Sequence, residues 1–485
     1  MRWTLKQVAN ALGVAPPAGL DPLARVAGVS IDSRAIRPGE LFFAIRGPRH
    51  DGHTFVAEVL QRGAAACVVA RTRKGEFSEA ISAKLFAVED TLVALQELAR
   101  SVARAWRAER SGRKMAALTG SAGKTTTKDI LAALLAARFR VLKSEGNLNN
   151  AYGLPLTLFR LENEDAAVVE LGMSRRGELQ RLAEIAEPEI GVVTNVAPVH
   201  LEFFSSVDEI ALAKRELIEG LAGPEPVAVL NADDARVARF AGGFRGHVLT
   251  FGFSASAMFR AQEIEARGAE GSAFEFVSPA GRERLTLPLV GRHNILNALA
   301  ALAAASEWGI GAAEAKEVLP KLQAAPLRGE ILRFAEGFTV INDCYNSNPL
   351  ALERMIDVLC SLPGVRRRIL VAGEWREIGA ASATLHQAAG KYAANKKAID
   401  WIFGVEGDAQ ELVRGAIAAG HPAAQTQFFA SSEDAAKFLS EFVSAGDVLL
   451  VKGSRGVRME TIAARLRERF LLAEVTVPAG RERSR

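Results

Sequence analysis

The feature that most constrains this chain is a short loop at residues 120–127, which reads GSAGKTTT. An apolar run at residues 115–118 precedes the loop, and a helical spacing of apolar residues follows it from Lys128. A strand, a glycine loop and a helix N-terminus bind phosphate together, because backbone N–H groups and the helix dipole converge on the anion. Lys124 adds a mobile cation, and the hydroxyl of Thr125 lies where it can ligate Mg²⁺ beside the phosphates. The loop therefore predicts binding of a nucleoside triphosphate.

This loop is shorter than the general phosphate-binding motif, which has four residues between its two glycines. Here only Ser121 and Ala122 separate Gly120 from Gly123. The shorter form points away from GTPase switches and ordinary kinases, and towards a narrower group of ATP-dependent ligases. The residues expected to hold ATP here are Gly120, Ser121, Ala122, Gly123, Lys124, Thr125 and Thr126.

Composition indicates a multidomain globular protein. A length of 485 residues exceeds what a single core supports and predicts roughly two to four domains. Hydrophobic residues make up 49% and charged residues 24%, which is typical of soluble proteins. A net charge of +4 is small for this size and does not support a nucleic-acid-binding face. We therefore expect small anionic ligands and no nucleic acid.

Nothing in the sequence indicates secretion, a disulfide framework or a membrane anchor. Cys67, Cys344 and Cys360 share no metal-ligand spacing, so neither disulfides nor a zinc site is expected. The first residues lack the apolar run of a signal peptide, and no stretch is long and apolar enough to span a bilayer. We expect a cytoplasmic protein without membrane insertion, whose residues 481–485 form a solvated tail.

The alternation of strand-like and helix-like segments predicts an α/β fold with three domains. Residues 1–90 form a small mixed unit, residues 91–326 a central unit with a parallel sheet around the glycine loop, and residues 327–485 a second, Rossmann-like α/β unit. A long helix at residues 91–107 is expected to link the first two, and residues 259–290 to form an antiparallel meander at the edge of the central sheet. Expected strands lie at residues 26–32, 41–45, 64–69, 115–118, 167–171, 191–196, 227–230, 338–342, 369–372, 402–403 and 448–451, and further helices at 54–62 and 298–308.

Two polar residues near the ends of expected strands are candidates for the metal ion that accompanies a triphosphate. Glu170 could be a solvated strand-end carboxylate, but Gly172 after it and the glycine loop before it favour a metal ligand. His200 follows an expected parallel strand, where open α/β sheets bind ligands, although a structural histidine stays an alternative. The residues alone mark Lys214 as an ordinary surface lysine on a helix.

Three further segments allow both a binding and a structural interpretation. Residues 342–349 are unusually polar after a strand and suit a ligand loop, but Asn348 and Pro349 would also serve as a helix N-cap. Residues 452–455 supply two cations and a hydroxyl after another strand, which suits a carboxylate or phosphate. Residues 291–297 are either a ligand segment or a capped helix start.

Together these segments resemble the Mur ligases of peptidoglycan synthesis over nearly the whole chain. Residues 343–349 are the most discriminating, because they resemble the branch of the family that adds D-alanyl-D-alanine. The other matching segments are residues 31–34, 38–45 and 51–53 for a uridine-nucleotide domain, and residues 119–127, 146–150 and 153–155 for the ATPase domain. The chain departs from the common pattern at residues 203–206, which lack the usual glycines, and at Glu374 and Trp375, where Asp and Met are commoner.

The resemblance implies an ATP-dependent amide ligase that joins D-alanyl-D-alanine to UDP-N-acetylmuramoyl-tripeptide through an acyl phosphate. It implies ATP and two Mg²⁺ ions, and it matches Lys214 to a lysine that is carbamylated in this family. Catalytic roles are implied for Lys124, His200 and Lys214, and metal contacts for Thr125, Glu170, His200 and Lys214. Nucleotide contacts are implied for Asn297, Arg328 and Asp343, contacts to the UDP substrate for Asp32, Ser33, Arg34, Asp51 and His53, and a place near the dipeptide for Asn346, Asn348, Lys452, Ser454 and Arg455.

Other functions remain open on the sequence. Another Mur-type ligase or a folylpolyglutamate synthase would share the ATPase domain, although the uridine-type first domain counts against the latter. A nucleotide-dependent switch protein would belong to a different class, and would hydrolyse ATP without an acceptor. We expect a monomer, although no residue pattern determines the oligomeric state or whether the tripeptide ends in lysine or diaminopimelate.

Overall fold

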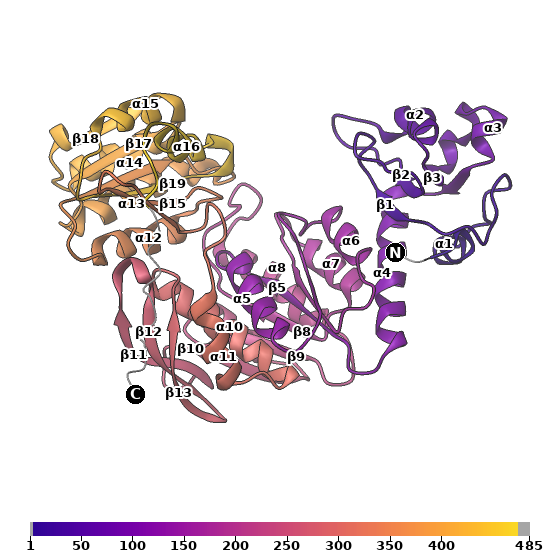
Figure 1. The fold of residues 1–485 in the computed structure, drawn as a ribbon, viewed down its shortest axis with the longest axis horizontal. Helices are drawn as coiled ribbons and strands as arrows, with labels where there is room; N and C mark the ends of the chain where they lie inside the picture. The colour runs from indigo at the N-terminus through magenta and orange to yellow at the C-terminus, as the bar shows by residue number, and fades with distance from the viewer. Residues whose placement is uncertain (1–2, 474–485) are drawn as a thin grey trace, which may run out of the picture.

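The computed structural model describes residues 3–473, so the tail expected at residues 481–485 lies outside the described residues. The described chain contains three separate sheets, of four, nine and six strands. Figure 1 shows the N-terminal and C-terminal units at opposite ends, with the central unit between them. The expected α/β class with three units is confirmed, and none of the described helices is long and apolar enough to cross a membrane.

The N-terminal sheet is parallel throughout and has the order β1-β2-β3-β4. Its strands are β1 (Gly28–Ser30), β2 (Glu40–Phe43), β3 (Ala66–Ala70) and β4 (Leu85–Val88). Helix α1 (Leu5–Leu12) and helix α2 (Val56–Gln61) cover its two faces, because alternate strand residues such as Phe42 and Phe43 pack into different cores.

The expected linking helix is α4 (Thr91–Glu109), which starts where the Asp90 side chain accepts hydrogen bonds from the first free backbone N–H groups. It is fixed to the central unit, since it packs against α6 (Gly153–Leu158) and α7 (Glu178–Ala186). The indole N–H of Trp106 on α4 donates to the Glu164 carbonyl at 3.0 Å. The helix therefore joins the N-terminal sheet firmly to the central one.

The central sheet has the order β13-β12-β11-β10-β9-β8-β5-β7-β6 and is parallel from β6 to β11. Antiparallel pairing of β11, β12 and β13 confirms the expected meander. The strands are β5 (Lys114–Thr119), β6 (Val141–Lys143), β7 (Ala166–Glu170), β8 (Ile190–Val193), β9 (Val227–Asn231), β10 (His247–Gly252), β11 (Phe259–Ala266), β12 (Ser272–Ser278) and β13 (Gly281–Leu287).

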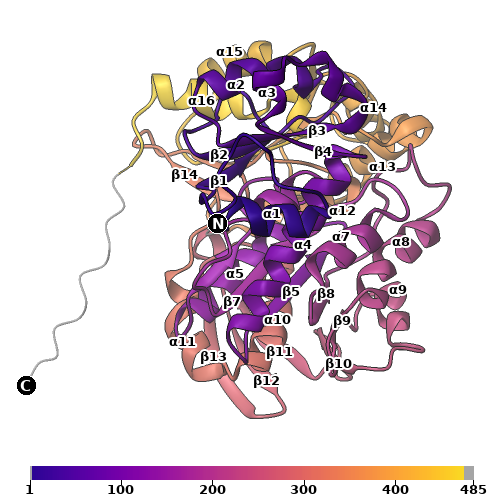
Figure 2. The same cartoon turned by 90° about the vertical axis from the view of Figure 1, so that its right-hand side faces the viewer.

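Helices cover both faces of this sheet (Figure 2). Helix α5 (Lys124–Ala136) and helix α10 (Arg292–Ala305) pack on the face that receives Leu118 of β5. Helices α7 and α8 (Val207–Glu219) pack on the face that receives Ala117. A strand buried on both sides reads as a continuous apolar run, which is why residues 115–118 were recognisable in the sequence.

The C-terminal sheet has the order β14-β15-β19-β16-β17-β18 and is parallel except for β14. Helices α12 to α14 share one core with it, and α15 and α16 share the other. The strands are β14 (Glu330–Arg333), β15 (Thr339–Asp343), β16 (Arg367–Gly373), β17 (Trp401–Val405), β18 (Thr426–Phe429) and β19 (Asp447–Lys452), and the helices are α12 (Pro349–Ser361), α13 (Ser382–Asn395), α14 (Ala409–Ala418), α15 (Ser432–Phe442) and α16 (Glu460–Arg469).

The structure differs from the expected elements mainly at their ends and at short strands. The strand expected at residues 26–32 is only three residues long, and the helix expected at residues 298–308 begins at Arg292 and ends at Ala305. Strands β4, β6, β10, β14 and β18 were not expected. Four of these five lie at a sheet edge or are short, and such strands carry too few residues for a clear alternation to show.

Candidate active site

A cavity of about 770 Å³ lies between the central and C-terminal units, at the carboxyl ends of the parallel strands. Open α/β sheets bind ligands at this end. The predicted residues that line it are Ser121, Ala122, Gly123, Lys124, Thr125, Thr126, Glu170, His200, Asn297, Arg328, Asp343, Asn346, Asn348 and Lys452. The predicted residues outside its lining are Gly120, Lys214, Ser454, Arg455 and the five of the N-terminal unit.

The glycine loop joins β5 to α5, as expected, and needs both of its glycines. Gly120 has φ +149° and Gly123 has φ +87°, values that favour glycine. A Cβ atom at Gly120 would collide with Thr194, and one at Gly123 with the Asn297 side chain. Asn195 holds the loop between them, because its amide accepts from the Ala122 N–H at 3.0 Å and donates to the Ala122 carbonyl at 2.9 Å.

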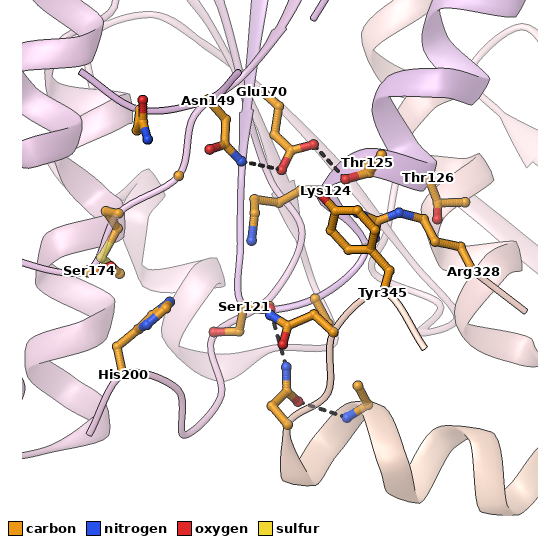
Figure 3. Close-up of a pocket in the computed structure, with 18 of the residues that line it drawn as sticks. Ser121, Lys124, Thr125, Thr126, Asn149, Glu170, Ser174, His200, Arg328 and Tyr345 are labelled. Atoms are coloured by element: carbon orange, nitrogen blue, oxygen red, sulfur yellow. Dashed lines mark hydrogen bonds between the residues drawn. The ribbon is translucent and has the colours of Figure 1, made fainter. Parts of the chain in front are cut away.

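Thr125 and Glu170 lie side by side at the start of α5 (Figure 3). The Thr125 hydroxyl donates to Glu170 Oε2 at 2.6 Å, and Asn149 Nδ2 donates to Oε1 at 2.9 Å. Glu170 is only 4% exposed, so the alternative of a solvated strand-end carboxylate is wrong. A hydroxyl beside an oriented carboxylate suits Mg²⁺, which binds through few protein ligands and completes its shell with water and phosphate oxygens.

Lys124 is the central cation of the cavity. Its Nζ donates to the carbonyl of Gly120 at 2.6 Å. Burial lowers the pKa of the Lys124 ammonium below its ordinary value; Glu170 opposes this shift, and Arg328 adds to it. Seven lysine and arginine side chains line the cavity, Lys124 and Arg328 among them, against the three carboxylates of Glu170, Glu178 and Asp343. This excess of positive charge favours an anionic ligand.

Lys214 lies on α8 and is not the surface lysine that its sequence context suggested. Its side chain is buried, with 2% of the residue exposed, because the face of α8 that carries it packs against the central sheet. No other described residue gives its ammonium a hydrogen bond or an ion pair. Burial, with a smaller contribution from Lys124, holds the pKa of Lys214 well below its ordinary value. A buried amine of this kind is uncharged far more readily than an exposed one.

His200 lies in the loop between β8 and α8, in the left-handed region with φ +56°. Its Nδ1 lies 2.5 Å from Glu377 Oε2, and Glu377 belongs to the C-terminal unit. This hydrogen bond lowers the pKa of Glu377 below its usual range. Within residues 3–473 no three His, Cys, Asp or Glu side chains converge as a metal cluster, so any magnesium site here depends on mixed ligands such as Thr125.

The loop after β15 contacts both its own unit and the glycine loop. Asn348 accepts from the Ala351 N–H at 2.9 Å, so the helix N-cap interpretation is confirmed. The same side chain donates to the Ser121 carbonyl at 3.5 Å, which brings it against the phosphate-binding loop as well. The guanidinium group of Arg328 lies 3.8 Å from the centre of the Tyr345 ring, a cation–π contact at the cavity wall.

Lys452 and Ser454 make their hydrogen bonds within the C-terminal unit. Lys452 Nζ contacts Asp343 Oδ2 at 2.5 Å and the Asn346 carbonyl at 3.0 Å, so it braces the loop after β15. The Ser454 hydroxyl accepts from the Arg376 N–H at 3.0 Å. At residues 291–297, helix α10 starts after Gly291 without a side-chain cap, and Asn297 lines the cavity. The contact of Asn297 with a nucleotide stays a prediction.

The predicted residues of the N-terminal unit form two local groups away from this cavity. Asp32 pairs with Arg34, and their hydrogen bond lowers the pKa of Asp32 to about 2. Burial alone would raise the pKa of Asp51, but hydrogen bonds from His53 and Arg73 outweigh it and lower that pKa to about 2. The contacts of the five residues Asp32, Ser33, Arg34, Asp51 and His53 with a nucleotide stay a prediction.

Comparison with known proteins agrees with this arrangement over nearly the whole chain. Matches are found to the Mur ligase family, catalytic domain, at residues 25–103, the Mur ligase middle domain at residues 118–305, and the Mur ligase, glutamate ligase domain, at residues 327–455. The UDP-N-acetylmuramoyl-tripeptide–D-alanyl-D-alanine ligase of Escherichia coli is 35% identical over 91% of this chain and 93% of its own length. The chain belongs to the Mur ligase family. The corresponding ligase of Bacillus subtilis is 32% identical over the same shares.

Solved structures of Mur ligases share the fold. MurF from Acinetobacter baumannii has a TM-score of 0.85 at 29% identity, covering 96% of this chain and 99% of that one. MurF from Thermotoga maritima in complex with ADP has a TM-score of 0.79 at 28% identity, covering 91% and 97%. Folylpolyglutamate synthase of Mycobacterium tuberculosis, at 16% identity and a TM-score of 0.62 over 77% of this chain, shares only the fold.

Three residues of this Mur ligase site were not selected from the sequence. Asn149 orients Glu170 and lies in the segment at residues 146–150 that carried the family resemblance. Thr194 and Asn195 are two polar residues directly after a strand, and this pattern alone indicates a binding site only weakly. Glu377 reaches His200 from a segment distant in the sequence, so only folding brings the two together.

Proposed function

We propose that this chain is an ATP-dependent amide ligase that joins D-alanyl-D-alanine to UDP-N-acetylmuramoyl-tripeptide, giving the UDP-linked pentapeptide. The single observation that carries the proposal is a cavity with the phosphate-binding loop on one wall and the polar loop after β15 on the other. The names of the relatives from Escherichia coli and Bacillus subtilis support the choice of substrates.

The chemistry begins with a carboxylate, which is a poor acylating group. Its oxygen attacks the γ-phosphorus of ATP, the bond to the bridging oxygen breaks, and ADP leaves. Lys124 and Arg328 stabilise the charge on the transferring phosphoryl group, so catalysis is mainly positioning and electrostatics. The amine of D-alanyl-D-alanine then attacks the acyl phosphate, loses a proton and expels inorganic phosphate.

Thr125, Glu170 and His200 would hold Mg²⁺, with Asn149 orienting the carboxylate of Glu170. When bound, Mg²⁺ neutralises charge on the β- and γ-phosphates. The unpaired, buried amine of Lys214 suits carbamylation: its nitrogen attacks CO₂, forms an N–C bond and releases a proton. The product is an anion, which reverses the charge at this position and would support a second metal ion.

Substrates would reach this site from the flanking units. The dipeptide side would be formed by Asn346, Asn348, Lys452, Ser454 and Arg455, and the UDP side by Asp32, Ser33, Arg34, Asp51 and His53. Asn297 and Asp343 would contact the adenosine part of ATP. The hydrogen bond from Asn348 to Ser121 joins the C-terminal unit to the phosphate loop, and this closed arrangement would exclude water from the acyl phosphate.

A ligation assay tests this proposal. The protein is incubated with ATP, Mg²⁺, a UDP-tripeptide ending in lysine or diaminopimelate, and one of several amines. We expect phosphate release and a product with the mass of the pentapeptide only with D-alanyl-D-alanine. Phosphate release with free D-alanine but not with the dipeptide would contradict the proposal, and ATP hydrolysis without any acceptor would favour a nucleotide switch. The cytoplasmic location and the monomeric state stay predictions.

A further inference from the structure

A carboxylate of the C-terminal unit contacts a histidine of the central unit at the edge of the cavity. Glu377 Oε2 lies 2.5 Å from His200 Nδ1, and the Glu202 N–H donates to the Glu377 carbonyl at 3.5 Å. A Cβ atom at Gly379 would lie 3.3 Å from the backbone of Glu202. The loop after β8 and the loop after β16 therefore meet through backbone as well as side chains.

Both partners of this contact have unusual backbone conformations. His200 has φ +56° and Glu377 has φ +62°, and residues other than glycine seldom occupy this region. Such conformations persist where the surrounding structure requires them, and they cluster at functional sites. The two loops thus direct these two side chains at each other.

The contact determines which nitrogen of His200 faces the cavity. A carboxylate accepts hydrogen bonds, so the proton of the neutral imidazole resides on Nδ1, and Nε2 keeps its lone pair. His200 lines the same cavity as Lys124 and Glu170, and Figure 3 shows its ring facing that space. Metal-binding histidines characteristically donate their other ring N–H to a carboxylate, which orients the ring and makes it a better ligand.

We propose that Glu377 is a positioning residue that orients His200 for the metal ion, and that it thereby links metal binding to docking of the C-terminal unit on the central one. The inference rests on the proposed function, since it takes His200 as a metal ligand. Because Glu377 is carried by the C-terminal unit, His200 is held in its binding orientation only while the two units are in contact. The metal site is then complete only in the docked arrangement, where the loop after β15 also faces the phosphate loop.

Glu377 can be substituted with little effect on folding. Its side chain is 50% exposed, and an exposed pair of this kind contributes little to folding. Its backbone contact with Glu202 does not depend on the side chain. Glu377→Gln keeps the shape and an acceptor oxygen but removes the charge, and Glu377→Ala removes both. Glu433→Gln is the matched control, because Glu433 is a 54% exposed carboxylate of the same unit that pairs with Arg458.

The experiment measures Mn²⁺ binding to the full chain in the presence of a non-hydrolysable ATP analogue, from the electron paramagnetic resonance signal of free Mn²⁺. We expect the Mn²⁺ Kd to rise about 10–100-fold in Glu377→Ala and by less in Glu377→Gln. Affinity for the analogue without metal should stay at the wild-type value in both variants, and Glu433→Gln should match the wild type throughout.

Equal Mn²⁺ affinity in Glu377→Ala and the wild type would overturn the inference while leaving the proposed ligase intact. Wild-type protein that binds the analogue but no Mn²⁺ would overturn the proposed metal site and the inference with it. If Glu377→Ala lost affinity for the metal-free analogue as strongly as it lost affinity for Mn²⁺, Glu377 would have a general structural role. That result would also overturn the inference.

Discussion

The hydroxyl of Thr125 lies 2.6 Å from the carboxylate of Glu170, and both side chains are buried at the start of α5. Thr125 comes from the phosphate-binding loop and Glu170 from the end of β7, the strand next to β5 in the sheet. Because β5 and β7 are neighbouring parallel strands, the loop that follows β5 and the end of β7 lie at the same edge of the sheet, which brings the hydroxyl and the carboxylate together. We expect Thr125 and Glu170 to bind the metal ion together.

We expect Glu170→Gln to lower kcat at least about 100-fold, because a neutral amide is a poor Mg²⁺ ligand. The amide still fills the same space, so the melting temperature should change little. Steady-state phosphate release at increasing Mg²⁺ measures the effect. Glu184→Gln on α7, at a 44% exposed carboxylate, is the control. Full activity of Glu170→Gln at ordinary Mg²⁺ would rule out the metal role.

Gly123→Ala should weaken ATP binding about tenfold or more. A Cβ atom here meets the Asn297 side chain, and φ +87° strains any residue with a side chain. Either the loop or Asn297 must move, and both line the cavity. Gly75→Ala is the matched control, since nothing lies within 4 Å of a Cβ atom there. Calorimetric titration with ADP compares the two, and equal Kd values would contradict the assignment of the loop.

Lys214→Ala should be inactive, with partial recovery when a short-chain carboxylic acid is supplied. Lys214 has no partner for a positive charge in the described chain, and burial disfavours its charged form. A carbamate on Lys214 would supply a negative charge that a metal ion can bind. In the alanine variant, an added carboxylate would occupy the space left by the side chain and supply the same charge. Activity assays with and without acetate or propionate measure the recovery. Wild-type activity in the unrescued variant would refute the carbamate role.

We expect Asp51→Asn to lower the free energy of unfolding between pH 7 and pH 5. In acid the substitution should lower it less. The folded pKa of Asp51, about 2, lies below its ordinary value of 3.8, so its stabilising contribution is present above that value and is lost as pH falls towards 2. Solvent screening at this partly exposed site limits the contribution to about 1 kcal/mol.

Thermal unfolding of the wild type and Asp51→Asn, followed at several pH values from 7 to about 2, tests this pH dependence. The difference between the two melting temperatures should shrink as the pH falls from about 4 towards 2. Glu89→Gln serves as the control, because Glu89 is a 79% exposed carboxylate of the same unit and pairs with Arg71. A difference between wild type and Asp51→Asn that stays constant down to about pH 2 would contradict the shifted pKa.

Much of the fold could be predicted because its main strands are buried on both faces and appear as continuous apolar runs. The nucleotide loop could be predicted because strand, glycines and helix start are contiguous, so local conformation alone places Lys124 and Thr125. Element ends and short edge strands were missed, since few residues there carry a periodic pattern. Glu170 could be proposed because strand ends of a parallel sheet share one edge.

The three-part α/β organisation and the phosphate-binding loop could both be predicted, because both arise from contiguous patterns of side-chain polarity. Three relationships became visible only in the folded chain: Lys214 is buried, Asn149 orients Glu170, and Glu377 contacts His200 from another unit. These relationships join residues far apart in the chain, and they depend on how helices pack on sheets and how one unit docks on the next. Periodicity reports which face of an element is apolar, but it does not report which distant side chain that face will meet.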